Sequence, residues 1–169
     1  MDCAAIGTFG NPIWSKEENM SVAVTLHLLA MVIWVGGMFF AHNFLRPASQ
    51  QLPLEQRITL WAGVFRRFFA LVWISAITLP VTGYWIIFSQ MGGMAGVGLY
   101  IHLMQGLGLL MIALYTYMYF GPYRAFKRMA DELLFPEAGM YMLKIRTIVT
   151  INLVLGLTTV IVGSAGRYI

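Results

Sequence analysis

Charged residues are scarce in this sequence. Only 11% of its 169 residues are Asp, Glu, Lys or Arg, whereas 59% are hydrophobic and the mean hydropathy is +0.74. A water-soluble domain of this length would normally be about one quarter charged. The composition therefore excludes an ordinary soluble domain and predicts an integral membrane protein.

Cysteines and intramembrane acids are also lacking. Cys3 is the single cysteine, which excludes an intrachain disulfide and a metal site built on cysteines. No acidic residue falls in a long apolar stretch, which argues against a proton-relay pump and against hydrolytic catalysis. The seven acids are Asp2, Glu17, Glu18, Glu55, Asp131, Glu132 and Glu137.

The apolar residues form four stretches, each long enough to cross a bilayer as a helix. The predicted spans are residues 21–42, 68–89, 99–120 and 147–165, and residues 1–20 form a short extracytoplasmic segment. We expect an all-α, four-helix transmembrane bundle in which residues 21–169 make a single domain. The tyrosines and Phe120 at the end of the third span, Tyr115 among them, are expected to form an interfacial belt.

The distribution of Lys and Arg predicts the orientation of this bundle. Nine of the eleven lie between spans 1 and 2 or between spans 3 and 4, and only Lys16 and Arg167 lie on the other side. The positive-inside rule then places both termini outside (N-out/C-out), as in a multi-pass protein of the bacterial inner membrane. The net charge of +4 is accounted for by this topology, and we expect no nucleic-acid partner.

Two histidines lie inside the spans. His27 and His102 are on the first and third helices, which run in the same direction, and both are within two turns of the outer side. An intramembrane ionisable residue needs a partner, and two imidazoles at equal depth in a bundle suit the axial ligation of a haem iron. The alternative is that each ring hydrogen-bonds a neighbouring helix and binds nothing.

The surrounding residues fit such a cofactor. Trp34 follows His27 at helical spacing and offers an apolar wall, Gly106 leaves room one turn from His102, and Arg167 offers a cation for a propionate. The sequence therefore predicts a membrane b-type cytochrome that transfers electrons through haem b, with quinol, an oxygen species or another redox protein as partner. Such a protein would be a haem-dependent oxidoreductase, although enzymatic turnover itself stays open.

The sequence also resembles a known family. The resemblance rests on His27 with Trp34-Val-Gly-Gly, Leu45-Arg46-Pro47, Arg66-Arg67, Thr82-Gly83, His102 and Asn152 to Gly156. These residues resemble the CopD superfamily and, more distantly, the haem-binding protoporphyrinogen oxidases of the HemJ type. The resemblance implies a haem b site with His27 as ligand, and it implies copper handling.

Two alternative functions follow from this resemblance. The first is copper transport or resistance, with Met91, Met94 and Met104 near the outer surface as a loose copper site. The second is a protoporphyrinogen oxidase-like activity. Met104 stands where the oxidases have a lysine, two residues after the histidine of the third helix, and this disfavours the second alternative.

Overall fold

The computed structural model describes residues 16–166 and is helical throughout that part of the chain, apart from short connections. The elements, in chain order, are α1 (Lys16–Met31), η1 (Val32–Gly36), α2 (Gly37–Phe40), η2 (Ala41–Leu45), α3 (Arg46–Ser49), α4 (Leu54–Gln90), η3 (Met94–Gly96), α5 (Leu99–Met118), η4 (Tyr119–Tyr123), α6 (Arg124–Asp131) and α7 (Phe135–Ala165). The residues described contain no β-strand.

These elements combine into four long helical rods. Within residues 16–166, four helices are long and apolar enough to span a membrane: Glu17–Ser49, Leu54–Gln90, Leu99–Asp131 and Phe135–Ala165. The expected all-α, four-helix membrane fold is therefore confirmed. The rods are longer than a bilayer requires, so several of their turns extend beyond the hydrocarbon core.

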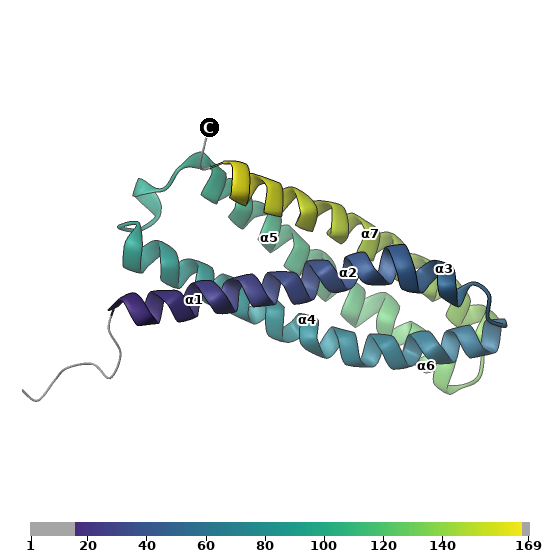
Figure 1. Ribbon diagram of the computed structural model, residues 1–169. Coiled ribbons are helices and arrows are strands. Elements are labelled where there is room, and N and C mark those ends of the chain that lie inside the picture. Colours follow the sequence, from purple (N-terminus) through teal and green to yellow (C-terminus); the bar gives the residue numbers. More distant parts are fainter. Residues whose placement is uncertain (1–15, 167–169) are drawn as a thin grey trace, which may run out of the picture.

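The four rods pack side by side, with α1 against α4 and α5 against α7, while α4 and α7 join the two pairs (Figure 1). The start of α1 and the end of α7 lie at one end of the bundle, and α3 and α6 lie at the other. The chain runs along the bundle four times, an even number, so its first and last described residues lie at the same end. We call the end with the start of α1 the outer end, following the predicted orientation, and the opposite end the inner end.

A close approach between α2 and α4 explains one of the glycines in the first rod. A Cβ atom at Gly37 would collide with the ring of Phe68 on α4. Small residues of this kind let helix backbones approach each other in membranes, where lipid offers little hydrophobic driving force. Next to Gly37 the first rod passes through the π-helical turn η1, which carries the buried Trp34.

The core of the inner half is largely aromatic. Phe65, Phe69 and Tyr115 are each at most 4% exposed, and the Tyr115 hydroxyl donates a 2.8 Å hydrogen bond to the carbonyl of Phe69. Tyr115 is therefore a core residue, and its assignment to an interfacial belt was wrong. Tyr117 and Phe120, at 66% and 50% exposed, do lie on the surface.

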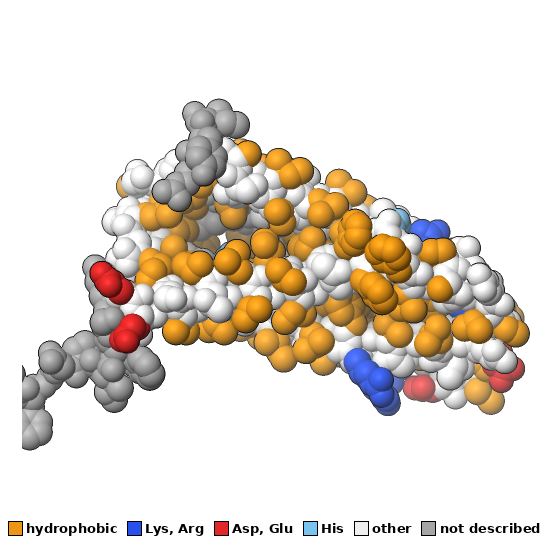
Figure 2. All heavy atoms as spheres, in the orientation of Figure 1, with side chains coloured by type: hydrophobic (Ala, Val, Ile, Leu, Met, Phe, Trp, Pro, Cys, Tyr) orange, Lys and Arg blue, Asp and Glu red, His pale blue; other side chains and the backbone are white. Residues whose placement is uncertain are grey.

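The exterior of the bundle is apolar along its length. Figure 2 shows hydrophobic side chains over most of the visible face, with Lys and Arg gathered toward the inner end. Large apolar residues of α4, such as Ile74, Ile77 and Phe88, are each more than 60% exposed. An apolar surface of this extent suits contact with lipid rather than water.

Candidate functional site

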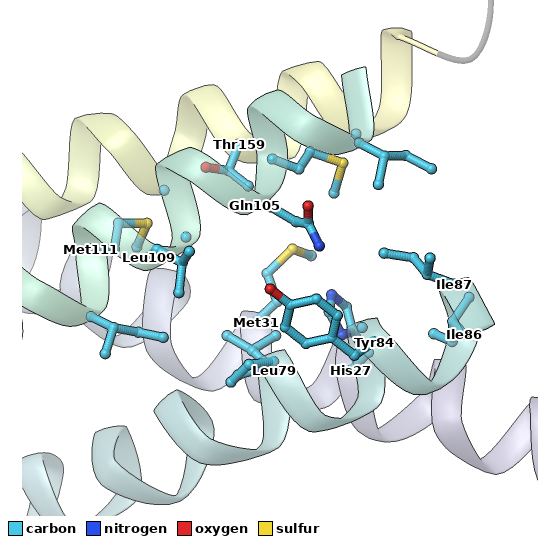
Figure 3. Close-up of a pocket in the computed structure, with 18 of the residues that line it drawn as sticks. His27, Met31, Leu79, Tyr84, Ile86, Ile87, Gln105, Leu109, Met111 and Thr159 are labelled. Atoms are coloured by element: carbon cyan, nitrogen blue, oxygen red, sulfur yellow. The ribbon is translucent and has the colours of Figure 1, made fainter. Parts of the chain in front are cut away.

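A cavity of about 380 Å³ lies in the outer half of the bundle, between α1, α4, α5 and α7 (Figure 3). This volume is within the range of about 300–1,000 Å³ that is typical of small-ligand pockets. Its walls are mostly apolar, and none of the described residues that line it is acidic or basic apart from His27. Its other polar side chains are Tyr84, Tyr100, Gln105 and Thr159.

His27 is held in one orientation by Thr82 on α4. The Nδ1 atom of His27 lies 2.8 Å from Oγ1 of Thr82, and that hydroxyl lies 2.7 Å from the carbonyl oxygen of Thr78. The hydroxyl has a single proton, which it donates to the carbonyl, so we infer that it accepts a hydrogen bond from Nδ1–H of His27. Nε2 of the neutral ring then carries a free lone pair.

Gly83 lies next to this ring. A Cβ atom at Gly83 would lie 3.4 Å from Cε1 and 3.8 Å from Nδ1 of His27, which is ordinary van der Waals contact. Pro80, one turn earlier, also lines the cavity, and α4 continues through it without a break. Thr82 therefore orients His27, and the next residue, Gly83, packs near its ring.

Thioether sulfurs are the other potential ligands around the cavity. Four methionines from α1, from α5 and from the loop that follows α4 line it: Met31, Met91, Met104 and Met111. Met31 is one helical turn from His27, so both side chains lie on the same face of α1. Met104 packs against Gly163 of α7, where an added Cβ would lie 3.0 Å from the sulfur. Gln105 donates a 3.5 Å hydrogen bond to the sulfur of Met94 beside the cavity.

The predicted site residues fall into three groups. Trp34 is 2% exposed and lines the cavity with His27, as expected. His102 and Gly106 are exposed and lie outside the set of residues that line it. Among the described residues, the two histidines therefore do not meet at one cavity. Arg167 lies outside the described residues.

The rotation of α5 explains why His102 is not in the cavity. The residues of α5 that line it, such as Ile101, Met104, Gln105 and Gly108, recur at helical spacing, and His102 and Gly106 fall on the neighbouring face. Helix α5 is apolar on all sides, so its sequence gives no signal for which face turns inward. The sequence predicts that the two histidines lie at a similar depth in the membrane, but it does not predict whether they face each other.

Several residues of the site were not singled out from the sequence. Gln105, Tyr84, Tyr100 and Thr159 project from three helices, and no spacing rule connects them. Thr82 offered a signal, because a hydroxyl between Pro80 and a glycine in a membrane helix suggests a hydrogen bond to another helix.

The floor of the cavity is closed by packed aromatic rings. Trp34 lies edge-on to Tyr115, with ring centroids 5.9 Å apart, and Tyr115 lies edge-on to Phe69 at 5.8 Å. Below them is a second cavity, also of about 380 Å³, lined by Phe69, His42 and Arg46 among others. The aromatic rings separate the outer cavity from the inner one.

Residues 62–165 match a known protein family. The family model described as copper resistance protein D (CopD) matches residues 62–165, which include most of α4 and the whole of α5, α6 and α7. This chain belongs to the CopD family. No curated protein and no solved structure gives a match.

The CopD match and the four apolar helices together identify a multi-pass membrane protein of a copper-resistance family. The matched residues include Thr82, Gly83 and Met104, whereas His27 and Met31 lie on α1, outside the match. The role of His27 therefore depends on the geometry described above.

Proposed function

We propose that this CopD protein handles copper in the bacterial inner membrane by binding Cu(I) in the outer cavity, with Nε2 of His27 and the thioethers of Met31 and Met104 as ligands. The observation that carries the proposal is the 2.8 Å contact between Nδ1 of His27 and Thr82, which leaves Nε2 unprotonated at a cavity lined by methionines. A metal-binding histidine is commonly held in this way, by a hydrogen bond from its other ring nitrogen.

The chemistry of the cavity favours Cu(I) over other metals. Soft thioethers and imidazole select Cu(I), whereas Mg²⁺, Ca²⁺ and Mn²⁺ prefer carboxylates and carbonyl oxygens. In the described part of the chain, no three His, Cys, Asp or Glu side chains come together as a metal site. A monovalent ion also costs less to transfer into an apolar cavity than a divalent one.

The aromatic rings at the floor of the outer cavity would limit the movement of copper toward the inner end. The Trp34–Tyr115–Phe69 stack lies between the two cavities, and the inner one is lined by Arg46 and Arg146, whose charges repel a cation. This arrangement favours capture of copper at the outer end. Passage to the inner end would require the aromatic rings to move.

A haem b site is the second candidate, and His27 is the observation that favours it. The same Nε2 atom would suit a haem iron, in an apolar cavity next to Trp34. The remaining residues fit less well, because His102 is outside the cavity and no Lys or Arg of the described residues lines it for a propionate. Electron transfer with quinol or another redox partner would depend on this cofactor, so copper is the better-supported ligand.

Titration of the purified full-length protein with Cu(I), against a competing chromophoric chelator, tests the proposal. We expect one Cu(I) per chain, with affinity strongly reduced in His27→Ala and reduced in Met31→Leu, a substitution that keeps volume but removes sulfur. Met140→Leu is the matched control, because Met140 is 60% exposed and does not line the outer cavity. An affinity unchanged in His27→Ala would overturn the proposal. Protein that purifies with a haem spectrum lost in the same variant would favour the second candidate.

A further inference from the structure

The inner end of the bundle carries a group of arginines that the copper proposal does not use. Nine Lys and Arg residues lie on this side, and six of them are exposed: Arg66, Arg67, Arg124, Lys127, Arg128 and Lys144. The other three, Arg46, Arg57 and Arg146, are half-buried. Topology alone requires basic residues on this side, but it does not require them to be half-buried.

In the described part of the chain, the three half-buried arginines lie near one another without a carboxylate partner. The positive charges of Arg46 and Arg57 both act on Arg146. Nε of Arg57 and Nε of Arg146 are buried and have no hydrogen-bond partner. Within residues 16–166, none of the three makes an ion pair with a carboxylate. Buried charges of like sign are costly unless an anion compensates them.

Other side chains hold this arginine group in place. The guanidinium carbon of Arg146 lies 5.8 Å from the centroid of the Trp61 ring, and Trp61 donates a buried 3.0 Å hydrogen bond to Ser49. Ser49 in turn donates a 2.9 Å hydrogen bond to the carbonyl of Arg46. The backbone of Arg46 and the guanidinium of Arg146 are thus connected through two buried side chains, which places the two residues on neighbouring elements before any ligand arrives.

The inner cavity lies next to this group. Arg46 and Arg146 line it together with His42, and most of its other walls are aromatic or aliphatic, Trp61, Phe65 and Phe69 among them. The site therefore combines a cationic group with an apolar space of about 380 Å³. A molecule that satisfies both halves has an anionic head and an apolar tail.

We propose that Arg46, Arg57 and Arg146 bind the phosphate of an anionic phospholipid from the surrounding bilayer, and that one of its acyl chains enters the inner cavity. Guanidinium groups bind phosphate through paired, charge-assisted hydrogen bonds, and the unpartnered Nε atoms are the donors for such bonds. Basic pockets between transmembrane helices are known lipid-headgroup sites. This proposal does not depend on copper binding, because the aromatic stack separates the two cavities.

Native mass spectrometry of the full-length protein tests the proposal. The protein in detergent receives phosphatidylglycerol or phosphatidylcholine with identical acyl chains, and inorganic phosphate serves as a third probe. We expect a phosphatidylglycerol adduct that survives detergent removal and a higher thermal unfolding midpoint with this lipid than with phosphatidylcholine. Equal retention of the two lipids would overturn the proposal, and so would equal stabilisation by inorganic phosphate, which would indicate a free-anion site.

Single substitutions then locate the site. Arg57→Gln and Arg146→Gln should each weaken phosphatidylglycerol binding by about tenfold, the loss expected for a charge-assisted hydrogen bond. Arg128→Gln is the matched control, since Arg128 is an exposed arginine of the same end, and it should bind like wild type. An equal loss in Arg128→Gln would mean a diffuse surface charge effect and would overturn the site. The wild-type lipid comparison needs no substitution, so it decides the proposal even if an arginine variant does not fold.

Discussion

Replacing Thr82 by valine tests the hydrogen bond on which the metal site depends. Valine has nearly the shape of threonine but no hydroxyl, so Nδ1–H of His27 loses the partner that lies at 2.8 Å. The ring can then rotate, or exchange its proton to Nε2, and either change removes the lone pair from the cavity. Loss of such a supporting group typically weakens metal binding by about 10–100-fold, or roughly 1.4–2.7 kcal/mol.

The assay is competitive Cu(I) titration of wild type and variants in detergent. Thr158→Val is the matched control, because Thr158 makes the same kind of hydrogen bond to the carbonyl four residues earlier but is exposed on α7. We expect Thr82→Val to lie between wild type and His27→Ala in affinity, and Thr158→Val to match wild type. Equal affinities in Thr82→Val and wild type would refute the inferred role of the Nδ1 hydrogen bond.

Three further predictions follow from the same structure. His102→Ala should bind Cu(I) like wild type because His102 is exposed outside the cavity, and a large loss there would support the pairing of two histidines instead. Cu(I) affinity should fall as the pH is lowered through the range in which imidazole protonates, because only the neutral ring binds metal. This pH dependence should be absent in His27→Ala. An identical pH dependence in the two proteins would contradict the role of His27 as a ligand. Tyr115→Phe should lower the free energy of unfolding by about 1 kcal/mol, because it removes a buried hydrogen bond, whereas the exposed Tyr117→Phe should leave thermal unfolding unchanged; equal stability of the two variants would argue against the Tyr115 bond.

The fold was predictable because its signals are strong and local. Long runs of uncharged residues must form helices in a bilayer, since every backbone group needs an internal partner there. The expectation of burial between helices was met by His27, which lines the cavity, but not by His102, which is exposed. The position of Trp34 at the same cavity followed from its helical spacing to His27, and its role toward a cofactor stays a prediction.

The rotation of the apolar helices was not predictable from the sequence. In a soluble protein the polar face of a helix turns toward water, but α5 is apolar on every side, and lipid and core residues look alike. The inward face is decided by packing, such as Met104 against Gly163 and Tyr115 against Phe69. The predictions for His102 and Tyr115 both failed for this reason. His102 was expected to face inward and is exposed, whereas Tyr115 was expected at the interface and is buried.

X-ray absorption spectroscopy at the copper edge, on the Cu(I)-loaded protein, tests the central claim most directly. We expect a first coordination shell with both sulfur and imidazole nitrogen, in which the nitrogen signal is lost in His27→Ala and the sulfur signal is reduced in Met31→Leu and Met104→Leu. A first shell of nitrogen or oxygen alone, or one unchanged in His27→Ala, would contradict a His27–thioether copper site.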